Sequence, residues 1–222
     1  MVRDGIYYFL AFTTAGVFTS AFVGPYFASP LFLVAAFCAW FFRDPERPLP
    51  AGPFCLSPAD GKVVCVVPEP GGLTRISIFL NIFDVHVNRT PISGIITDIT
   101  YKKGQFLVAS KEIASSDNEQ NIITVRASDG TVVVFKQIAG LIARRIISYK
   151  KVGDHVQAGD RIGLIKFGSR VDVILGPEWK IGVKPGMRVS AGSSVLASRA
   201  GQVAWTNDLA AVVAKEPAFC QT

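Results

Sequence analysis

The sequence has few of the residues from which metal centres and hydrolase sites are usually built. Its 222 residues include two histidines and four cysteines, and the cysteines show no CxxC spacing, which argues against a zinc site. There is no G-x-S-x-G motif of the kind that exposes the serine of an α/β-hydrolase. Without a Lys/Arg-rich run or a basic helix carrying stacking aromatics, the net charge of +6 does not indicate nucleic acid. We therefore expect neither a metal nor a nucleic-acid partner.

Charge is also missing from most of the N-terminal region. Residues 5–23 and 26–42 contain no charged side chain, and each run approaches the roughly 20 apolar residues that a membrane-spanning helix needs. Gly24-Pro25 separates the runs, which is compatible with a helical hairpin, with one kinked segment, or with a hairpin sunk in one leaflet. A cleaved signal peptide fits poorly, because the apolar stretch is too long for one.

Basic residues follow the second apolar run and favour the cytoplasmic side for the rest of the chain. Arg43, Arg47 and Lys62 lie just beyond it, in the position that the positive-inside rule predicts. A basic domain is also attracted to anionic lipid headgroups. We therefore expect residues 1–45 to form a membrane-associated helical segment, and residues 46–222 to form one domain on the cytoplasmic side of the cell membrane.

The rest of the sequence has the pattern of a β-rich domain. Short β-type runs alternate with Gly, Pro and Asp from Ser57 onward, and the clearest runs are residues 62–67, 75–80, 94–101, 121–127 and 131–138. Residues 128–130 predict a hairpin turn between the last two runs. Residues 139–148 are compatible with strand or helix. This pattern predicts a mainly β (α+β) fold behind N-terminal helices.

A weak internal repeat occurs in the last third of the sequence. Residues 151–163 and 184–196 share the frame K-x-G-x-x-V-x-A-G-x-x-(I/V), and each copy predicts a turn, a short strand, a turn and a strand. The frame resembles the half-motifs of lipoyl and biotinyl barrel-sandwich domains. No hairpin carries the lysine that such carriers modify, so the repeat indicates architecture rather than cofactor attachment.

Gly168-Ser169 interrupts a β-type run over residues 161–173. One interpretation is an ordinary tight turn, since Gly-Ser is a common turn pair. The other is chemical: the hydroxyl of Ser169 can reach the carbonyl of Gly168, because glycine has no Cβ to block the approach.

A base and an orienting acid are also available in the sequence. His86 lies among apolar residues and could be either a core histidine or a general base, whereas His155 is expected at the surface. Asp60, in a Pro-Ala-Asp-Gly turn, could serve turn geometry or orient a histidine. The sequence alone does not bring Ser169, His86 and Asp60 together.

Five segments in a fixed order carry a resemblance to a known family. They are FFRDPER at 41–47, SPADG at 57–61, FDVHVNRTP at 83–91, IAGLIARRI at 138–146 and FGSRVD at 167–172. Over nearly its full length the chain resembles the short phosphatidylserine decarboxylase proenzymes of bacteria and archaea. The resemblance implies an enzyme that converts phosphatidylserine in the membrane to phosphatidylethanolamine and CO2. It also implies a Schiff base on a covalent pyruvoyl group.

The resemblance assigns roles to the candidate residues. Ser169 would attack Gly168, cut the chain there and become the pyruvoyl group. The products would be a β chain of residues 1–168 and an α chain of residues 169–222, which stay associated. His86 would act as the base in the cut, and Asp60 would orient His86.

The sequence departs from the family pattern at two places. Longer relatives have a second histidine where this chain has Arg89. Either His86 takes the roles of both histidines, or Arg89 takes the task on the substrate side. Arg89 could hold the substrate carboxylate or phosphate, or it could form an ordinary ion pair. Arg144 and Arg145 are further candidates for phosphate binding. Compared with the family pattern, Gly176 is one extra residue in the strand after the cut, which predicts a bulge.

Two other functions compete with the decarboxylase. A non-enzymatic, membrane-anchored barrel-sandwich adaptor would explain the repeat and the N-terminal segment, but it leaves Phe167-Gly168-Ser169 and Asp84-Val85-His86 unexplained. It would also be expected to carry coiled-coil heptads, which this sequence lacks. A serine hydrolase that keeps its chain intact would lack the usual nucleophile motif.

Overall fold

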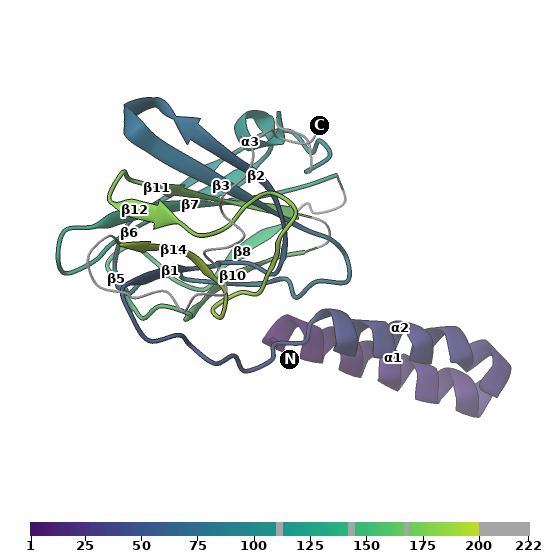
Figure 1. Ribbon diagram of the computed structural model, residues 1–222. Coiled ribbons are helices and arrows are strands. Elements are labelled where there is room, and N and C mark those ends of the chain that lie inside the picture. The colour runs from purple at the N-terminus through teal and green to yellow at the C-terminus, as the bar shows by residue number, and fades with distance from the viewer. Residues whose placement is uncertain (110–112, 142–144, 167–168, 200–222) are drawn as a thin grey trace. The chain divides into compact units, whose positions relative to one another are not determined.

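The computed structural model describes residues 1–109, 113–141, 145–166 and 169–199. These residues form two compact units (Figure 1). The first consists of Met1–Glu46 with the short segment Phe83–Val85. The second consists of Arg47–Ile82 together with the described residues from His86 onward.

Two helices that pack against each other dominate the first unit. They are α1 (Arg3–Phe22) and α2 (Pro25–Phe41). Gly24 joins them with a φ of 126°, a backbone conformation that favours glycine. A side chain at Gly16 would place its Cβ 2.9 Å from the ring of Phe32, so the helices approach closely where α1 has no side chain. The two apolar runs therefore form a hairpin rather than a single kinked segment.

The helices expose much of their apolar surface. By length and composition α1, at 20 residues, could cross a membrane, and α2 is a shorter apolar helix. Large aromatic side chains on both helices are exposed, among them Phe18, Phe22 and Tyr26. So many exposed apolar side chains on two packed helices are typical of a contact with lipid or with another protein.

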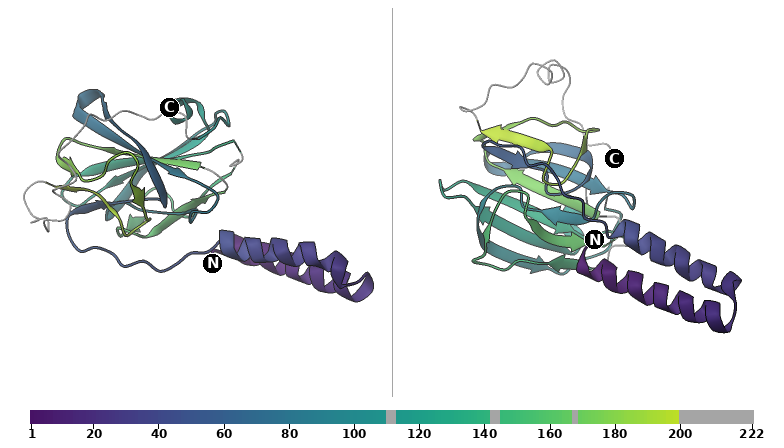
Figure 2. Two further views of the ribbon diagram at one scale, coloured as in Figure 1. Left: turned by 45° about the vertical axis from the view of Figure 1, so that its right-hand side comes forward. Right: turned by 90° about the horizontal axis from the view of Figure 1, so that it is seen from below.

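The described strands of the second unit form three antiparallel sheets. The largest has the order β13-β2-β3-β11-β7-β6-β5-β9, and the two smaller ones have the orders β1-β14-β12 and β4-β10-β8. Figure 2 shows the curled large sheet from two further sides. The bounds of the strands are β1 Phe54–Leu56, β2 Gly61–Glu69, β3 Leu73–Leu80, β4 Val87–Arg89, β5 Gly94–Lys102, β6 Gln120–Arg126, β7 Val132–Ile138, β8 Ile146–Ser148, β9 His155–Val156, β10 Arg161–Ile165, β11 Ser169–Leu175, β12 Trp179–Ile181, β13 Arg188–Val189 and β14 Val195–Arg199.

One hydrophobic core joins the three sheets. Side chains from the large sheet, such as Ile78, Phe135 and Val171, belong to the same buried cluster as Ile162 of β10 and Leu196 of β14. In the first half of β11 the polar Arg170 and Asp172 alternate with the apolar Val171 and Val173, because successive side chains of a strand point to opposite faces of its sheet. A short 3-10 turn (η1, Pro70–Gly72) links β2 to β3, and a short helix (α3, Ala114–Asp117) precedes β6.

The two copies of the sequence repeat have the same local structure. In the first copy Gly153 donates its amide to the carbonyl of Ile96 at 2.8 Å, and in the second Gly186 donates to Val63 at 2.8 Å. Both glycines have positive φ, 91° and 95°, which explains why the repeat keeps glycine there. Each copy continues as turn, short strand, turn and strand, as the sequence predicted.

Most predicted strands are confirmed, and with them the mainly β (α+β) fold class. The five clear runs correspond to β2, β3, β5, β6 and β7, and the turn at 128–130 joins β6 to β7. Part of the ambiguous region 139–148 forms β8. The predicted bulge at Gly176 is wrong. β11 pairs in unbroken register with β3 and ends at Leu175, so Gly176 lies in the following turn, where its carbonyl accepts the amide of Trp179 at 3.2 Å.

Candidate active site

Ser169 is the first residue of β11 and is completely buried. It lies opposite Leu80 of β3 in the large sheet. The preceding strand β10 ends at Ile165 and belongs to a different sheet, so the chain changes sheets just before Ser169. Among the described residues its Oγ has no hydrogen-bond partner. A buried hydroxyl without a partner is costly, and such an atom often marks a functional group. Gly168 lies outside the described residues.

His86 is also completely buried, immediately before β4. Its carbonyl accepts the amide of Ile165 at 3.4 Å, which ties the histidine to the end of β10. Since only a few residues separate Ile165 from Ser169, the two candidate catalytic residues come from neighbouring segments. The other histidine, His155, is exposed on β9 as expected.

A chain of buried amides connects β4, the strand that follows His86, to the large sheet. Asn121 donates Nδ2 to Oε1 of Gln137, and Gln137 donates Nε2 to Oδ1 of Asn88, both at 2.9 Å. These bonds fix how each amide is turned, and they leave Asn88 Nδ2 without a partner in the described part of the chain. Gln137 lies opposite Val171 on β11. These hydrogen-bonded amides therefore extend inside the core from Asn121 on β6 to Asn88, two residues after His86.

Asp60 has both carboxylate oxygens in hydrogen bonds. Oδ2 accepts from Arg47 Nη2 and Oδ1 accepts from the amide of Ala191, each at 2.8 Å. The second contact has a counterpart in the other half of the repeat, where Ser93 Oγ accepts the amide of Ala158 at 2.9 Å. Because a serine accepts the equivalent amide in the first copy, this contact of Asp60 belongs to the architecture that the two copies share. The role of Asp60 in orienting His86 stays a prediction.

The three candidate arginines lie in different surroundings. Arg89 is buried, and its Nη1 donates to the carbonyl of Gly159 at 3.2 Å, so part of its guanidinium holds the loop of the first repeat copy. Arg145 is exposed, and its carbonyl accepts the amide of Lys166 at 3.4 Å. Arg144 lies outside the described residues. Substrate binding by these arginines stays a prediction.

Comparison with known proteins places the chain in a family. The family model described as phosphatidylserine decarboxylase matches residues 34–197, which includes every candidate site residue from Asp60 to Ser169. The chain belongs to the phosphatidylserine decarboxylase family. The resemblance inferred from the five ordered segments is thereby confirmed.

Several relatives in this family carry the name phosphatidylserine decarboxylase proenzyme. One from Solibacter usitatus (strain Ellin6076) is 66% identical over 199 residues, which cover 90% of this chain and 97% of that protein. One from Syntrophus aciditrophicus (strain SB) is 43% identical over 206 residues, covering 88% and 96%. One from Saccharopolyspora erythraea is 46% identical over 178 residues, covering 76% and 75%.

The described part of the chain offers neither a second activated nucleophile among its free cysteines nor a metal centre. Burial raises the pKa of the Cys55 thiol far above its ordinary value, so this cysteine stays neutral and is a poor nucleophile. Within the ranges that the structure describes, no three His, Cys, Asp or Glu side chains are grouped as they would be around a metal ion.

Proposed function

We propose that this chain is a precursor that cuts itself between Gly168 and Ser169 and then decarboxylates phosphatidylserine with a pyruvoyl group made from Ser169. The observation that carries the proposal is the buried, unpartnered hydroxyl of Ser169 at the start of a central strand, in a chain of the phosphatidylserine decarboxylase family. The short relatives named proenzymes support the self-cutting step.

The cut begins with an acyl shift at Ser169. Its Oγ attacks the carbonyl carbon of residue 168, a C–O bond forms, the C–N bond breaks, and the proton of the hydroxyl passes to the nitrogen. The resulting ester then eliminates: Cα of residue 169 loses its proton, and the Cβ–Oγ bond breaks. Residue 168 leaves as a free carboxylate. A proton then moves from the nitrogen of residue 169 to its Cβ, which turns the enamine into an imine. Water finally replaces this nitrogen, which departs as ammonia, and a ketone remains.

His86 is the residue that moves protons in this scheme. A serine hydroxyl is a weak nucleophile until a base takes its proton, and a buried site offers little water for that task. The pKa of histidine suits it to accept and return a proton near neutral pH. In the mature enzyme the same imidazole would donate a proton to the carbon that has lost CO2. If Asp60 orients His86, its carboxylate would accept a hydrogen bond through lone pairs that are not used in its bonds to Arg47 and Ala191.

Ser169 fits the position of a pyruvoyl group because its side chain is buried and is not used in any hydrogen bond among the described residues. The ketone of that group takes up the amine of the substrate and accepts the electrons that remain when CO2 leaves, a task for which no amino-acid side chain is suited. The chain's own residues supply a dry interior around it and a histidine on a neighbouring segment.

Phosphatidylserine is a membrane lipid, and the helical hairpin accounts for access to it. The helix α1 has the length and composition to enter a bilayer. Arg43 and Arg47 follow the hairpin and would lie near lipid phosphates, where basic residues are attracted by anionic headgroups. We infer that the hairpin holds the protein at the cell membrane, with the β-rich unit on the cytoplasmic side.

The decisive experiment combines intact-mass measurement with a lipid assay. The purified protein should separate on a reducing, denaturing gel into residues 1–168 and 169–222, and the smaller piece should be one ammonia lighter than a serine start would make it. Ser169→Ala should stay full length and release no CO2 from phosphatidylserine vesicles. Ser128→Ala, in the β6–β7 turn, is the matched control and should behave as the wild type.

A second variant tests the base. His86→Ala should slow the cut by about 10²–10⁴-fold, the usual contribution of a general base. Release of the smaller piece would be followed on a gel against time. Normal kinetics would remove His86 from this role, and cutting of Ser169→Ala at the same bond would refute the serine-driven scheme.

A further inference from the structure

We propose that a buried arginine cluster beside Ser169 holds the new end of the α chain in place after the cut, and so positions residue 169 for decarboxylation. The cluster, here the Arg170 latch, consists of Arg170, Asp172, Ser77, Arg75 and Ser115. This inference rests on the proposed self-cutting and concerns positioning residues rather than catalytic ones.

The start of β11 is the place where the cut would loosen the structure. Ser169 pairs with Leu80 of β3, whereas pairing with β7 on the other side begins only at Arg170, opposite Ile138. Once the bond before Ser169 is broken, this end of the strand is a chain terminus. Termini fray unless something ties them down. A frayed end would move the reactive group at residue 169.

Arg170 is completely buried, and its side chain ties this end of the strand to β3. Its Nε donates to Oδ1 of Asp172, and its Nη2 donates to Oγ of Ser77, both at 2.6 Å. Arg170 and Asp172 lie on the same face of β11, two residues apart, and both side chains are inaccessible to water. Ser77 lies opposite Asp172 on β3, so the contact crosses from one strand to the next.

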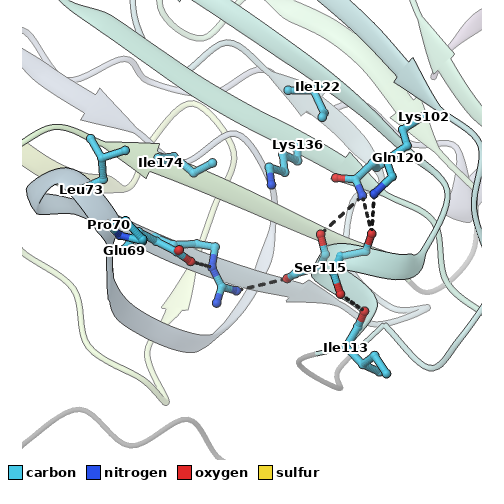
Figure 3. A pocket seen from close by; sticks show the side chains of 12 residues that line it. Glu69, Pro70, Leu73, Lys102, Ile113, Ser115, Gln120, Ile122, Lys136 and Ile174 are labelled. Carbon is cyan, nitrogen blue, oxygen red and sulfur yellow. Dashed lines mark hydrogen bonds and ion pairs between the residues drawn. The ribbon is translucent and has the colours of Figure 1, made fainter.

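Further contacts connect the latch to α3 and β2. Asp172 Oδ2 accepts from Ser115 Oγ at 2.6 Å and lies 3.6 Å from Nη1 of Arg75. Arg75 also donates Nη1 to Ser115 Oγ at 3.1 Å, and Nε to Glu69 Oε1 at 2.6 Å. Glu69 and Ser115 line a pocket of about 600 Å³ at this side of the sheet (Figure 3). The latch therefore extends from the fully buried Arg170 to the pocket that Arg75 lines together with Glu69 and Ser115.

Directional bonds explain why a charged cluster is used at this position. Taking an arginine and an aspartate out of water is expensive, and apolar residues in their place would often be as stable. Apolar contact, however, has no fixed direction, whereas the planar guanidinium bonds two partners at set angles. A slip of one residue along β11 would turn Arg170 to the apolar face. The latch thus opposes both fraying and slippage of the strand that begins with residue 169.

The test compares cut and uncut protein with and without the latch. Arg170→Met with Asp172→Leu removes both charges together, so that no buried charge is left alone. The double change would be made in the self-cutting chain and in the uncut Ser169→Ala chain. Hydrogen exchange of the amides of residues 170–172 should rise at least about tenfold in the cut variant, and less than about threefold in the uncut one, because only a free strand end frays readily.

Kinetics give a second readout. The double variant should still cut itself to completion, while its kcat falls by about 10–100-fold and its KM stays within about twofold, the pattern of a displaced reacting group. Arg199→Met, which removes the exposed ion pair with Asp129, is the control and should change neither exchange nor kcat. If the double variant does not fold, Ser77→Ala, which removes one acceptor of Arg170, should show the same changes to a smaller degree.

The outcomes separate this proposal from the one on which it rests. A wild-type chain that stays uncut refutes self-cutting and the latch together. Suppose instead that the wild-type chain cuts normally. The latch alone is then refuted if hydrogen exchange rises equally in the cut and uncut double variants, or if the kcat of the cut double variant is unchanged.

Discussion

Single polar residues fill one region of the interior that apolar side chains would ordinarily occupy. Gln137 is completely buried in β7, and its amide bridges Asn121 to Asn88. A buried amide that loses its hydrogen-bond partner keeps the full free-energy cost of leaving water. Such a bridge therefore stabilises the fold only while its hydrogen bonds are intact.

Gln137→Met should therefore destabilise the domain by about 1–3 kcal/mol, since it leaves Asn88 Oδ1 and Asn121 Nδ2 without their partner. The measurement is urea unfolding of the uncut Ser169→Ala chain, so that one continuous polypeptide unfolds. Lys136→Met, one residue earlier and pointing to the other face of the same strand, is the control and should cost much less. Equal losses for the two variants would show that the amide bridge contributes nothing particular.

The sequence pointed to Ser169 and His86 but not to the amides beside them. Ser169 and His86 stand in motifs that a family resemblance could identify, whereas Asn88, Asn121 and Gln137 are ordinary polar residues in strand patterns. The alternation along β7 could have marked Gln137 as inward-pointing, because it continues the series of Val133 and Phe135. Which strand lies across from it depends on the pairing of distant segments, and no local pattern contains that information.

At the scale of elements, the β6–β7 hairpin is held by its turn residues. Thr131 donates its amide to Oδ1 of Asp129 at 2.9 Å, and Arg199 of β14 forms an ion pair with the same carboxylate. The hydrogen bonds from Thr131, with the charge of Arg199, lower the pKa of Asp129 to about 2. The ionised carboxylate is thus favoured in the folded protein.

Asp129→Asn should lower the melting temperature by no more than about 3 °C at pH 7, because the group is exposed and solvent screens its charge. A lowered pKa contributes stability that is present above the ordinary aspartate value near 4 and is lost as the pH falls towards 2. The difference between wild type and variant should therefore shrink over that interval. Melting curves of the uncut chain between pH 2 and 7 would measure it, and a difference that grew towards pH 2 would contradict the assignment.

The order of the strands was much harder to predict than their existence. Alternation and turn residues marked β2, β3, β5, β6 and β7 to within a few residues. The short strands β4, β12 and β13 have only two or three residues, too few for a period to show. The expected bulge at Gly176 failed because it was inferred from the length of a segment, whereas the strand ends one residue earlier and the glycine serves the turn.

At the scale of the whole molecule, the hairpin and the β-rich unit are two compact units, and only the short segment Phe83–Val85 of the later sequence belongs to the first. A chain that begins at Arg47 contains every described strand of the three sheets and all residues of their shared core. We expect this shortened chain to be released from membranes by alkaline carbonate, while the full-length chain stays with them, because the exposed apolar helices are then missing. Retention of the shortened chain on membranes would show that another surface binds lipid. Folding of the shortened chain would be checked by its β-type circular dichroism.

Strands from the C-terminal part of the chain pair with strands from earlier in the sequence throughout the β-rich unit. β11 lies between β3 and β7, β13 pairs with β2, and β14 lies between β1 and β12. Before the bond at Ser169 is cut, these strands find their neighbours within one molecule. Afterwards, two polypeptides that are unfolded with a reductant present would have to meet again by diffusion, and their recovery should fall on dilution. Maturation therefore works in one direction: the precursor should renature, whereas the finished enzyme, once reduced and denatured, should recover poorly and has to be replaced by new synthesis.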